Sequence, residues 1–187
     1  MKYDSAKHHR RSVRLKGYDY AQAGAYFVTI CVQGRECVLG EVVDGQMRLN
    51  DCGCVAEECW KLLADQYSYV TVDASVIMPN HLHGIIVIDD GGDDARTGDS
   101  RIAPTDAPTT RKPLGRLVGA FKTVSTKRIN EMRGTPGAVF WQRNYWEHII
   151  HNEADLNRIR AYIQNNPARW ADDQLHPDAP PNPFNRG

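Results

Sequence analysis

The sequence lacks a long apolar run, a surplus of either charge and a cysteine pattern typical of disulfides or zinc. No stretch of about 18 apolar residues occurs, so no membrane-spanning helix is expected. The basic N-terminus has no apolar segment that would make it a secretory signal. The five cysteines are an odd number, and no second Cys or His pair at zinc-site spacing accompanies Cys52, Cys54 and Cys59. We therefore expect free thiols in a reducing cytoplasm.

The 187 residues that are present suffice for one domain with its own core. Patterning and turn signals predict strands at 24–32, 34–50 (with a turn at Asp44-Gly45), 69–78, 81–88 and 138–150, and helices at 52–66, 114–132 and 152–167. Asn50 and Asn152 are candidate helix N-caps. This order predicts an α+β fold: a central antiparallel sheet of about five strands, ferredoxin-like, with helices packed on it.

Two segments fall outside this pattern. Residues 89–112 consist mostly of Asp, Gly, Thr and Pro and are expected to form a flexible loop insertion. The proline-rich end, 171–187, is expected to be an irregular tail. We therefore expect one domain over 1–170, interrupted by that loop.

The stretch VIMPNHLHGIIVI, residues 76–88, places two histidines inside an apolar strand. Residues two apart face the same side of a strand, so His81 and His83 project together and Leu82 projects oppositely. Two neutral imidazoles in this arrangement could bind one divalent cation. The alternative is that both histidines lie on the solvated face of a half-buried strand.

The last expected helix carries a second pair, Tyr162 and Asn166, which share a helix face because they are four residues apart. The amide oxygen of Asn166 is a hard ligand that suits magnesium or manganese. The Tyr162 phenol is a nucleophile that could attack phosphorus. Alternatively, Tyr162 fills space beside apolar neighbours, and Asn166 merely ends the helix before Pro167.

Together these residues resemble the small HUH (histidine, bulky hydrophobic, histidine) single-tyrosine transposases, and most closely the REP-associated tyrosine transposases. The similar segments span most of residues 10–170: RRSVRLKGYDYAQAGAYFVTICVQGRE, VIMPNHLHGIIVI, LGRLVGAFK and FWQRNYWEHIIHNEADLNRIRAYIQNNPARW. The resemblance implies an HUH-type fold in which His81, His83 and Asn166 bind Mg²⁺ or Mn²⁺ and Tyr162 is the nucleophile. Tyr145, in QRNYWEHII, is an alternative nucleophile.

The activity implied by the resemblance is metal-dependent cutting and joining of single-stranded DNA through a 5′-phosphotyrosine intermediate. The implied substrates are hairpins of palindromic repeats, handled in the bacterial cytoplasm by a monomer or homodimer, with no membrane partner. Metal-bound phosphate and a basic surround are expected to favour the ionised form of Tyr162. Two alternatives remain open: a non-catalytic module that binds structured single-stranded DNA, and a structural zinc protein.

The charge distribution is compatible with a DNA substrate although the formal net charge is zero. Basic residues are concentrated at 1–20 and 111–133, whereas acidic residues are concentrated in the insertion. Such basic faces favour phosphate contacts, although a solvated helix face is the alternative reading. The predicted DNA contacts are Arg10, Arg11, Arg14, Arg116, Lys122, Lys127 and Arg128.

Overall fold

The computed structural model describes residues 15, 17–90 and 111–180. The strands are β1 (Gly24–Cys31), β2 (Gly40–Val43), β3 (Gln46–Leu49), β4 (Val70–Met78), β5 (His81–Ile88) and β6 (Trp146–Ile150). The helices are α1 (Asp51–Gln66), α2 (Leu114–Arg133) and α3 (Glu153–Asn165), and a 3-10 helix, η2 (Pro167–Asp172), follows α3. In the described parts of the chain, no helix combines the length and apolar composition needed to cross a bilayer.

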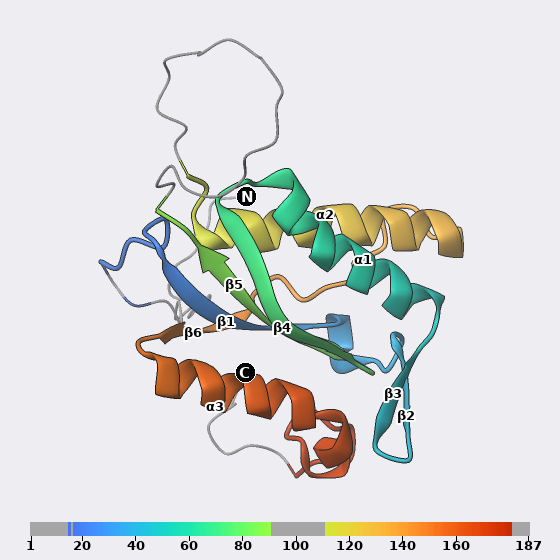
Figure 1. The fold of residues 1–187 in the computed structure, drawn as a ribbon. Helices are drawn as coiled ribbons and strands as arrows, with labels where there is room; N and C mark the ends of the chain where they lie inside the picture. The colour runs from blue at the N-terminus through green and yellow to red at the C-terminus, as the bar shows by residue number, and fades with distance from the viewer. Residues whose placement is uncertain (1–14, 16, 91–110, 181–187) are drawn as a thin grey trace, which may run out of the picture.

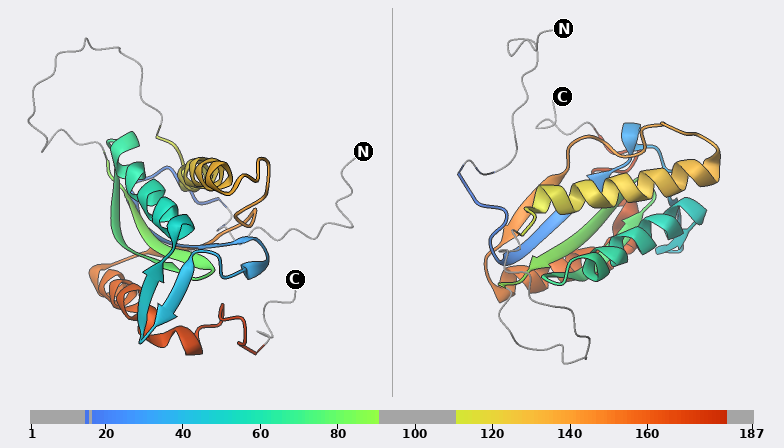
Figure 2. Two further views of the ribbon diagram at one scale, coloured as in Figure 1. Left: turned by 90° about the vertical axis from the view of Figure 1, so that its right-hand side faces the viewer. Right: turned by 90° about the horizontal axis from the view of Figure 1, so that it is seen from above.

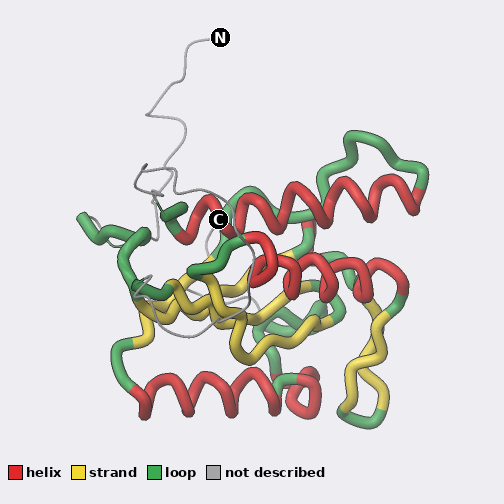
Figure 3. The backbone as a smooth tube through the Cα atoms, turned by 45° about the horizontal axis from the view of Figure 1, so that its top comes forward, coloured by secondary structure: helices red, strands yellow, loops and turns green. Residues whose placement is uncertain are grey.

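The main sheet has four antiparallel strands in the order β4-β5-β1-β6, and β2 and β3 form a separate hairpin. Helices α1 and α2 cover one face of this sheet and α3 covers the other (Figures 1 and 2). The hairpin lies beside η2 (Figure 3), where Gly45 approaches Ala168. The predicted α+β class with an antiparallel sheet is confirmed.

The two faces of the sheet bury different side chains because strand residues alternate in direction. Tyr26, Val28 and Ile30 of β1 pack in the large core under α1 and α2. Phe27 points the opposite way, into a small cluster with Ile85 of β5 and two α3 residues, Ile159 and Ile163. The thin apolar layer beneath α3 leaves room for polar side chains on that face.

Local sequence signals set the ends of the helices. The Asn50 side chain accepts a hydrogen bond from the Gly53 N–H (3.0 Å) at the start of α1. The Asn152 side chain accepts one from the Asp155 N–H (2.8 Å) at the start of α3. Each cap satisfies an N–H that has no partner inside its helix. Both predicted N-caps are therefore confirmed.

The strand expected over 138–150 is wrong in its first half, because β6 begins only at Trp146. Phe140 and Trp141 are buried in the core that contains α2 residues, and the Trp141 indole N–H donates to Ser125 of α2 (2.8 Å). Trp141 forms a single antiparallel bridge with Val32, and the rest of this segment is a loop whose apolar side chains serve tertiary packing. Tyr145, expected on the strand, lies directly before it.

Candidate functional site

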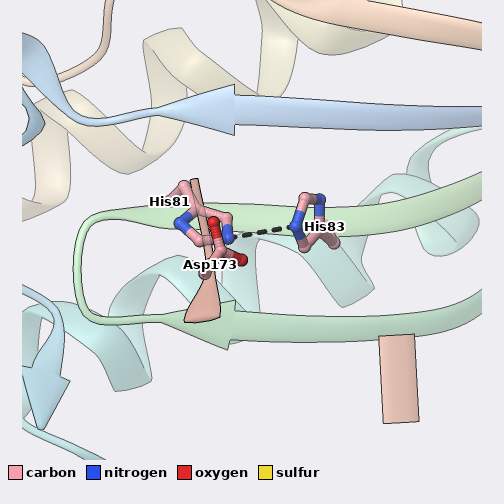
Figure 4. Close-up of side chains that lie close together, drawn as sticks. All are labelled: His81, His83 and Asp173. Atoms are coloured by element: carbon pink, nitrogen blue, oxygen red, sulfur yellow. Dashed lines mark hydrogen bonds between the residues drawn. The ribbon is translucent and has the colours of Figure 1, made fainter. Parts of the chain in front are cut away.

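His81 and His83 are the first and third residues of β5 and lie on the sheet face that α3 covers. Their side chains are 0% and 3% exposed, so the solvated-face alternative is wrong. The two Nε2 atoms are 3.0 Å apart (Figure 4). Leu82, between them, packs into the opposite core with α1 and α2.

Neighbouring side chains orient both imidazoles. Nδ1 of His81 lies 2.8 Å from the side-chain oxygen of Asn80, which can only accept, so His81 carries its proton on Nδ1 and has a lone pair on Nε2. Nδ1 of His83 lies 2.9 Å from the Thr29 hydroxyl, which can donate or accept. With the hydroxyl as acceptor, both Nε2 lone pairs face the same point, the arrangement that metal-binding histidines need.

Both histidines are neutral at physiological pH. Burial, with a smaller contribution from the Arg35 charge, lowers the pKa of His81 to about 3. Burial and the neighbouring His81 also hold the pKa of His83 well below its usual value, and the Asp173 carboxylate opposes this only partly. Neutral imidazoles keep the lone pairs that bind cations.

Asp173 adds a carboxylate to the two histidines (Figure 4), and the candidate ligand atoms of the three residues all lie within 4.8 Å of one another. It follows η2, so it lies within the expected tail. The Leu175 N–H donates to its Oδ1 (2.6 Å), and Asn80 donates to the Leu175 carbonyl (2.7 Å). The turn before β5 therefore holds the Asp173 segment beside the histidines.

Asn166, the ligand expected from the sequence, lies at the C-terminal end of α3 and is 4% exposed. Its Nδ2 donates to Asp173 Oδ2 at 3.4 Å. No described group donates a hydrogen bond to its buried Oδ1. A buried acceptor left in this state is costly, and a cation between Asn166 and the histidines would satisfy it. The buried donor set therefore fits a divalent metal, whichever residue supplies the third ligand.

Tyr162 of α3 places its hydroxyl 3.2 Å from Nε2 of His83, and its ring is edge-on to Phe27. Burial and the Asp173 charge raise the pKa of the phenol, and Asn166 and Arg169 oppose this. Arg169 thus acts in the direction expected of a basic surround, but burial and Asp173 outweigh it. The hydroxyl must lose its proton before or during any nucleophilic attack.

A groove of about 1050 Å³ opens in front of these residues. Phe27, His83, Tyr162 and Asn166 contribute to its wall, together with Trp146 and Tyr145. Three arginines, Arg35, Arg158 and Arg169, also line it. Two aspartates, Asp172 and Asp173, line it as well, so the arginines leave a small excess of positive charge. An open groove with this charge and a buried polar end could admit a phosphodiester strand.

The other predicted residues are distributed differently. Tyr145 lines the groove but packs against the main core, with the Lys122 ammonium above its ring. Lys122 donates to the Gln142 and Asn144 carbonyls, and Arg128 pairs with Glu58 (2.7 Å), so both also have structural contacts. Arg10, Arg11 and Arg14 lie outside the described residues.

Several site residues could not be inferred from the sequence. Asp173 carries no local motif. The sequence indicates Asn80 only as the residue before the strand at 81–88, and Thr29 only as a residue of the strand at 24–32. The alternation of β1 does place Thr29 and Phe27 on one face, but nothing in the sequence indicates that this face borders His83.

The chain is similar in sequence to two known proteins. An uncharacterised protein from Haemophilus influenzae is 41% identical over 181 residues, which cover 95% of this chain and 98% of the relative. A second H. influenzae protein, provisionally named a REP-associated tyrosine transposase, is 27% identical over 90% of this chain and 84% of its own length. No protein-family model matches the chain.

Among solved structures, a REP-associated tyrosine transposase bound to a REP hairpin has a similar fold, with a TM-score of 0.56. The identity is 17%, and the match covers 88% of this chain and 77% of that one. This structural match shows that the two proteins share a fold. In sequence and in fold the chain is therefore similar to REP-associated tyrosine transposases.

Proposed function

We propose that this protein is a transposase: a metal-dependent endonuclease and strand transferase for single-stranded, hairpin-forming DNA, acting through a 5′-phosphotyrosine intermediate. One observation carries the proposal: the Tyr162 hydroxyl lies 3.2 Å from the same His83 Nε2 atom that faces His81. A nucleophile and a buried cation site thus meet at one end of a groove. The hairpin bound by the similar solved transposase supports the substrate class.

His81, His83 and either Asp173 or Asn166 would hold the cation. The mixture of imidazole and oxygen ligands suits Mn²⁺, and Mg²⁺ with waters completing its shell. When bound, the ion would polarise one phosphate and offset the charge that develops on its oxygens. Asn80 and Thr29 would keep the two imidazoles aimed at one point.

In the proposed reaction, the Tyr162 oxygen attacks phosphorus in line while the phenolic proton leaves. The bond from phosphorus to the 3′ oxygen breaks, and that oxygen takes up a proton to become a free 3′-hydroxyl. A phosphotyrosine ester replaces the phosphodiester, so its energy is retained. Attack by a 3′-hydroxyl, from the same or another strand, reverses the step and rejoins DNA without ATP.

The experiment that tests this proposal is a denaturing gel with labelled hairpin oligonucleotides taken from the repeats that flank the gene. The wild-type protein is expected to form a labelled covalent band with Mn²⁺ or Mg²⁺, and the band should disappear with EDTA. Tyr162→Phe should give no band, because it removes only the nucleophilic oxygen. Tyr145→Phe, which changes the other groove tyrosine, is the matched control and should keep the band.

Two other outcomes would change the assignment. A band lost only in Tyr145→Phe would move the nucleophile from α3 to the residue before β6. Tight hairpin binding by every variant, with no covalent band under any metal, would favour a non-catalytic DNA-binding module. Zinc that remains bound through gel filtration would instead support a structural metal site.

A further inference from the structure

Trp146, the first residue of β6, is a large aromatic side chain left 47% exposed beside the candidate active site. The exposed ring is nevertheless held in place, because it packs edge-on against Phe27 (centroids 5.7 Å apart, interplanar angle 73°). Phe27 also contacts the rings of His83 and Tyr162. Trp146 is thus one aromatic contact removed from both the nucleophile and a candidate ligand.

The strand register fixes this placement independently of the side chains. Trp146 lies opposite Thr29 of β1, and Thr29 lies opposite His83 of β5. Directly opposed residues project from the same face of a sheet, so Trp146 and His83 share the face covered by α3. Two strand spacings separate their backbones by about 10 Å.

A second ring supports the indole. His148, two residues further along β6, is parallel to Trp146 (interplanar angle 5°, centroids 6.2 Å apart). Asp155 of α3 holds His148 through a 2.8 Å contact, and Asp155 also pairs with Arg158. The edge of the groove therefore presents an aromatic surface that is rigid before any ligand arrives.

From this geometry we infer that Trp146 is the stacking platform for an unpaired base that flanks the scissile phosphate. The inference rests on the proposed function, since it takes the cleaved strand as the ligand. Base stacking needs a fixed aromatic face, and phosphates on either side need cations. The same groove supplies both: Trp146 and His148 at one edge, and Arg35 and Arg169 elsewhere in its lining.

The occupant is a nucleobase and not a protein segment because the platform is continuous with the phosphate site. Arg35 and Arg169 line the same groove as His83 and Tyr162, so both charges lie where a phosphate would meet the reacting groups. A strand whose phosphate reaches Tyr162 must carry its neighbouring base past this wall. Recognition by stacking tolerates every base, so Trp146 would contribute affinity and position rather than sequence preference.

The test uses the full chain with Tyr162→Phe, so that the substrate stays intact, and hairpin oligonucleotides from the flanking repeats. An abasic position is moved one nucleotide at a time along the single-stranded flank. Adding Trp146→Ala should weaken binding of the intact oligonucleotide by about tenfold. At one position, an abasic site should by itself weaken binding by a similar factor. The same abasic site should weaken binding to Trp146→Ala little further, as expected for two groups that contact each other.

Further measurements separate stacking from structural damage. In the same Tyr162→Phe background, Trp146→Phe keeps an aromatic ring and should recover most of the affinity. DNA should quench the tryptophan fluorescence of the Tyr162→Phe parent more than that of the variant with Trp146→Phe. Leu62→Ala removes an exposed side chain from α1, across the sheet, and should bind as its parent does.

The inference is overturned if Trp146→Ala binds the intact hairpin as tightly as its parent. It is also overturned if the affinity lost through Trp146→Ala adds in full to the affinity lost at every abasic position. Trp146 would then act only through the fold. In both cases the DNA-cutting proposal stands. Failure of every variant, including the parent, to bind hairpin DNA would instead reject the proposed function, and this inference with it. If the protein does not bind DNA at Trp146 and instead self-associates in solution, the Trp146 surface is a protein interface.

Discussion

At the scale of single residues, Asn80 contributes more to the site than its place in a turn indicates. It is fully buried, accepts from His81 Nδ1 and donates to the carbonyls of Arg35 and Leu175. One amide therefore selects the His81 tautomer and joins the turn before β5 to the segment that carries Asp173. Groups of this kind commonly change metal affinity without contacting the metal.

Asn80→Ala is expected to weaken Mn²⁺ binding by about 10- to 100-fold, because His81 loses the acceptor that keeps its Nε2 lone pair available. Isothermal titration with Mn²⁺ measures the loss, and circular dichroism verifies that the variant folds. Asn165→Ala removes an exposed amide on α3 that bonds only to the Ala161 carbonyl among the described contacts, and it should bind Mn²⁺ normally. An unchanged affinity in folded Asn80→Ala would contradict the tautomer argument.

Asp173 and Asn166 compete for the place of third ligand. Asp173 brings a negative charge and Asn166 brings a buried oxygen without a described donor. Charge usually dominates affinity for hard cations, so Asp173→Asn should weaken Mn²⁺ binding by about tenfold or more. Asn166→Ala should have the smaller effect, and titrations of both variants compare them directly. The reverse order would identify Asn166, the residue expected from the sequence, as the ligand.

At the scale of elements, the position of Tyr162 depends on how α3 is held on the sheet. Besides the small apolar cluster, one link is Arg160, whose guanidinium donates to both carboxylate oxygens of Asp73 on β4 (2.9 and 2.5 Å). Asp73 lies where β4 shifts its pairing register with β5. The bulge turns the carboxylate toward the helix, and the bidentate geometry fixes the direction of α3.

This link makes stability depend on pH in acid. The hydrogen bonds from Arg160 hold the pKa of Asp73 below its usual value, although partial burial opposes the shift. The pair therefore stabilises the fold fully above the unfolded pKa of about 3.9, and this contribution is lost as pH falls through the lower folded pKa.

Asp73→Asn should lower the thermal midpoint by a few degrees at pH 7, and its difference from wild type should shrink below about pH 4. Thermal unfolding followed by circular dichroism from pH 3 to 8 measures both. Glu57→Gln, which disturbs an exposed pair with Lys61 on α1, should change the midpoint little at any pH. If the difference between the thermal midpoints of wild type and Asp73→Asn grew in acid, Asp73 would not stabilise the fold through its ionised pair with Arg160.

At the scale of the whole molecule, local signals predicted the elements and distant contacts placed the site. Asn50, Asn152 and the alternating residues of β5 act within a few positions of themselves, so their roles could be inferred from the sequence. Phe140 and Trp141 could not be assigned, because a loop that buries aromatic side chains has the same composition as a strand. Asp173 reaches His81 only through the path of η2, which no sequence period encodes.

The site histidines were predictable for a related reason. A strand has a strict two-residue period, so their common direction followed from spacing alone. Their burial did not follow, since it depends on α3 and on the segment after η2 covering that face. The same distinction separates Tyr162 and Asn166, whose shared helix face was predictable, from Trp146, whose nearness to His83 needs the register of three strands.

The two described ends of the insertion meet at the surface. Arg111 donates to the Asp90 carbonyl (2.7 Å) and pairs with its carboxylate (3.5 Å), so the chain leaves and re-enters the fold at nearly the same point. Neither Asp90 nor Arg111 lines the groove, and both residues lie outside β5 and α2. Replacing the intervening segment should therefore leave sheet and site intact, since a shorter closed loop costs less entropy.

Replacement of residues 91–110 by a Gly-Ser linker of about five residues is expected to keep Mn²⁺ affinity and covalent-band yield within about twofold of wild type, with an equal or slightly higher thermal midpoint. A version that also carries Arg111→Ala separates the effect of the Arg111–Asp90 contact from that of the segment. This version should lose only stability. If shortening abolished the covalent band while Mn²⁺ still bound, the segment would have to contact DNA itself, and the groove alone would not define the substrate site.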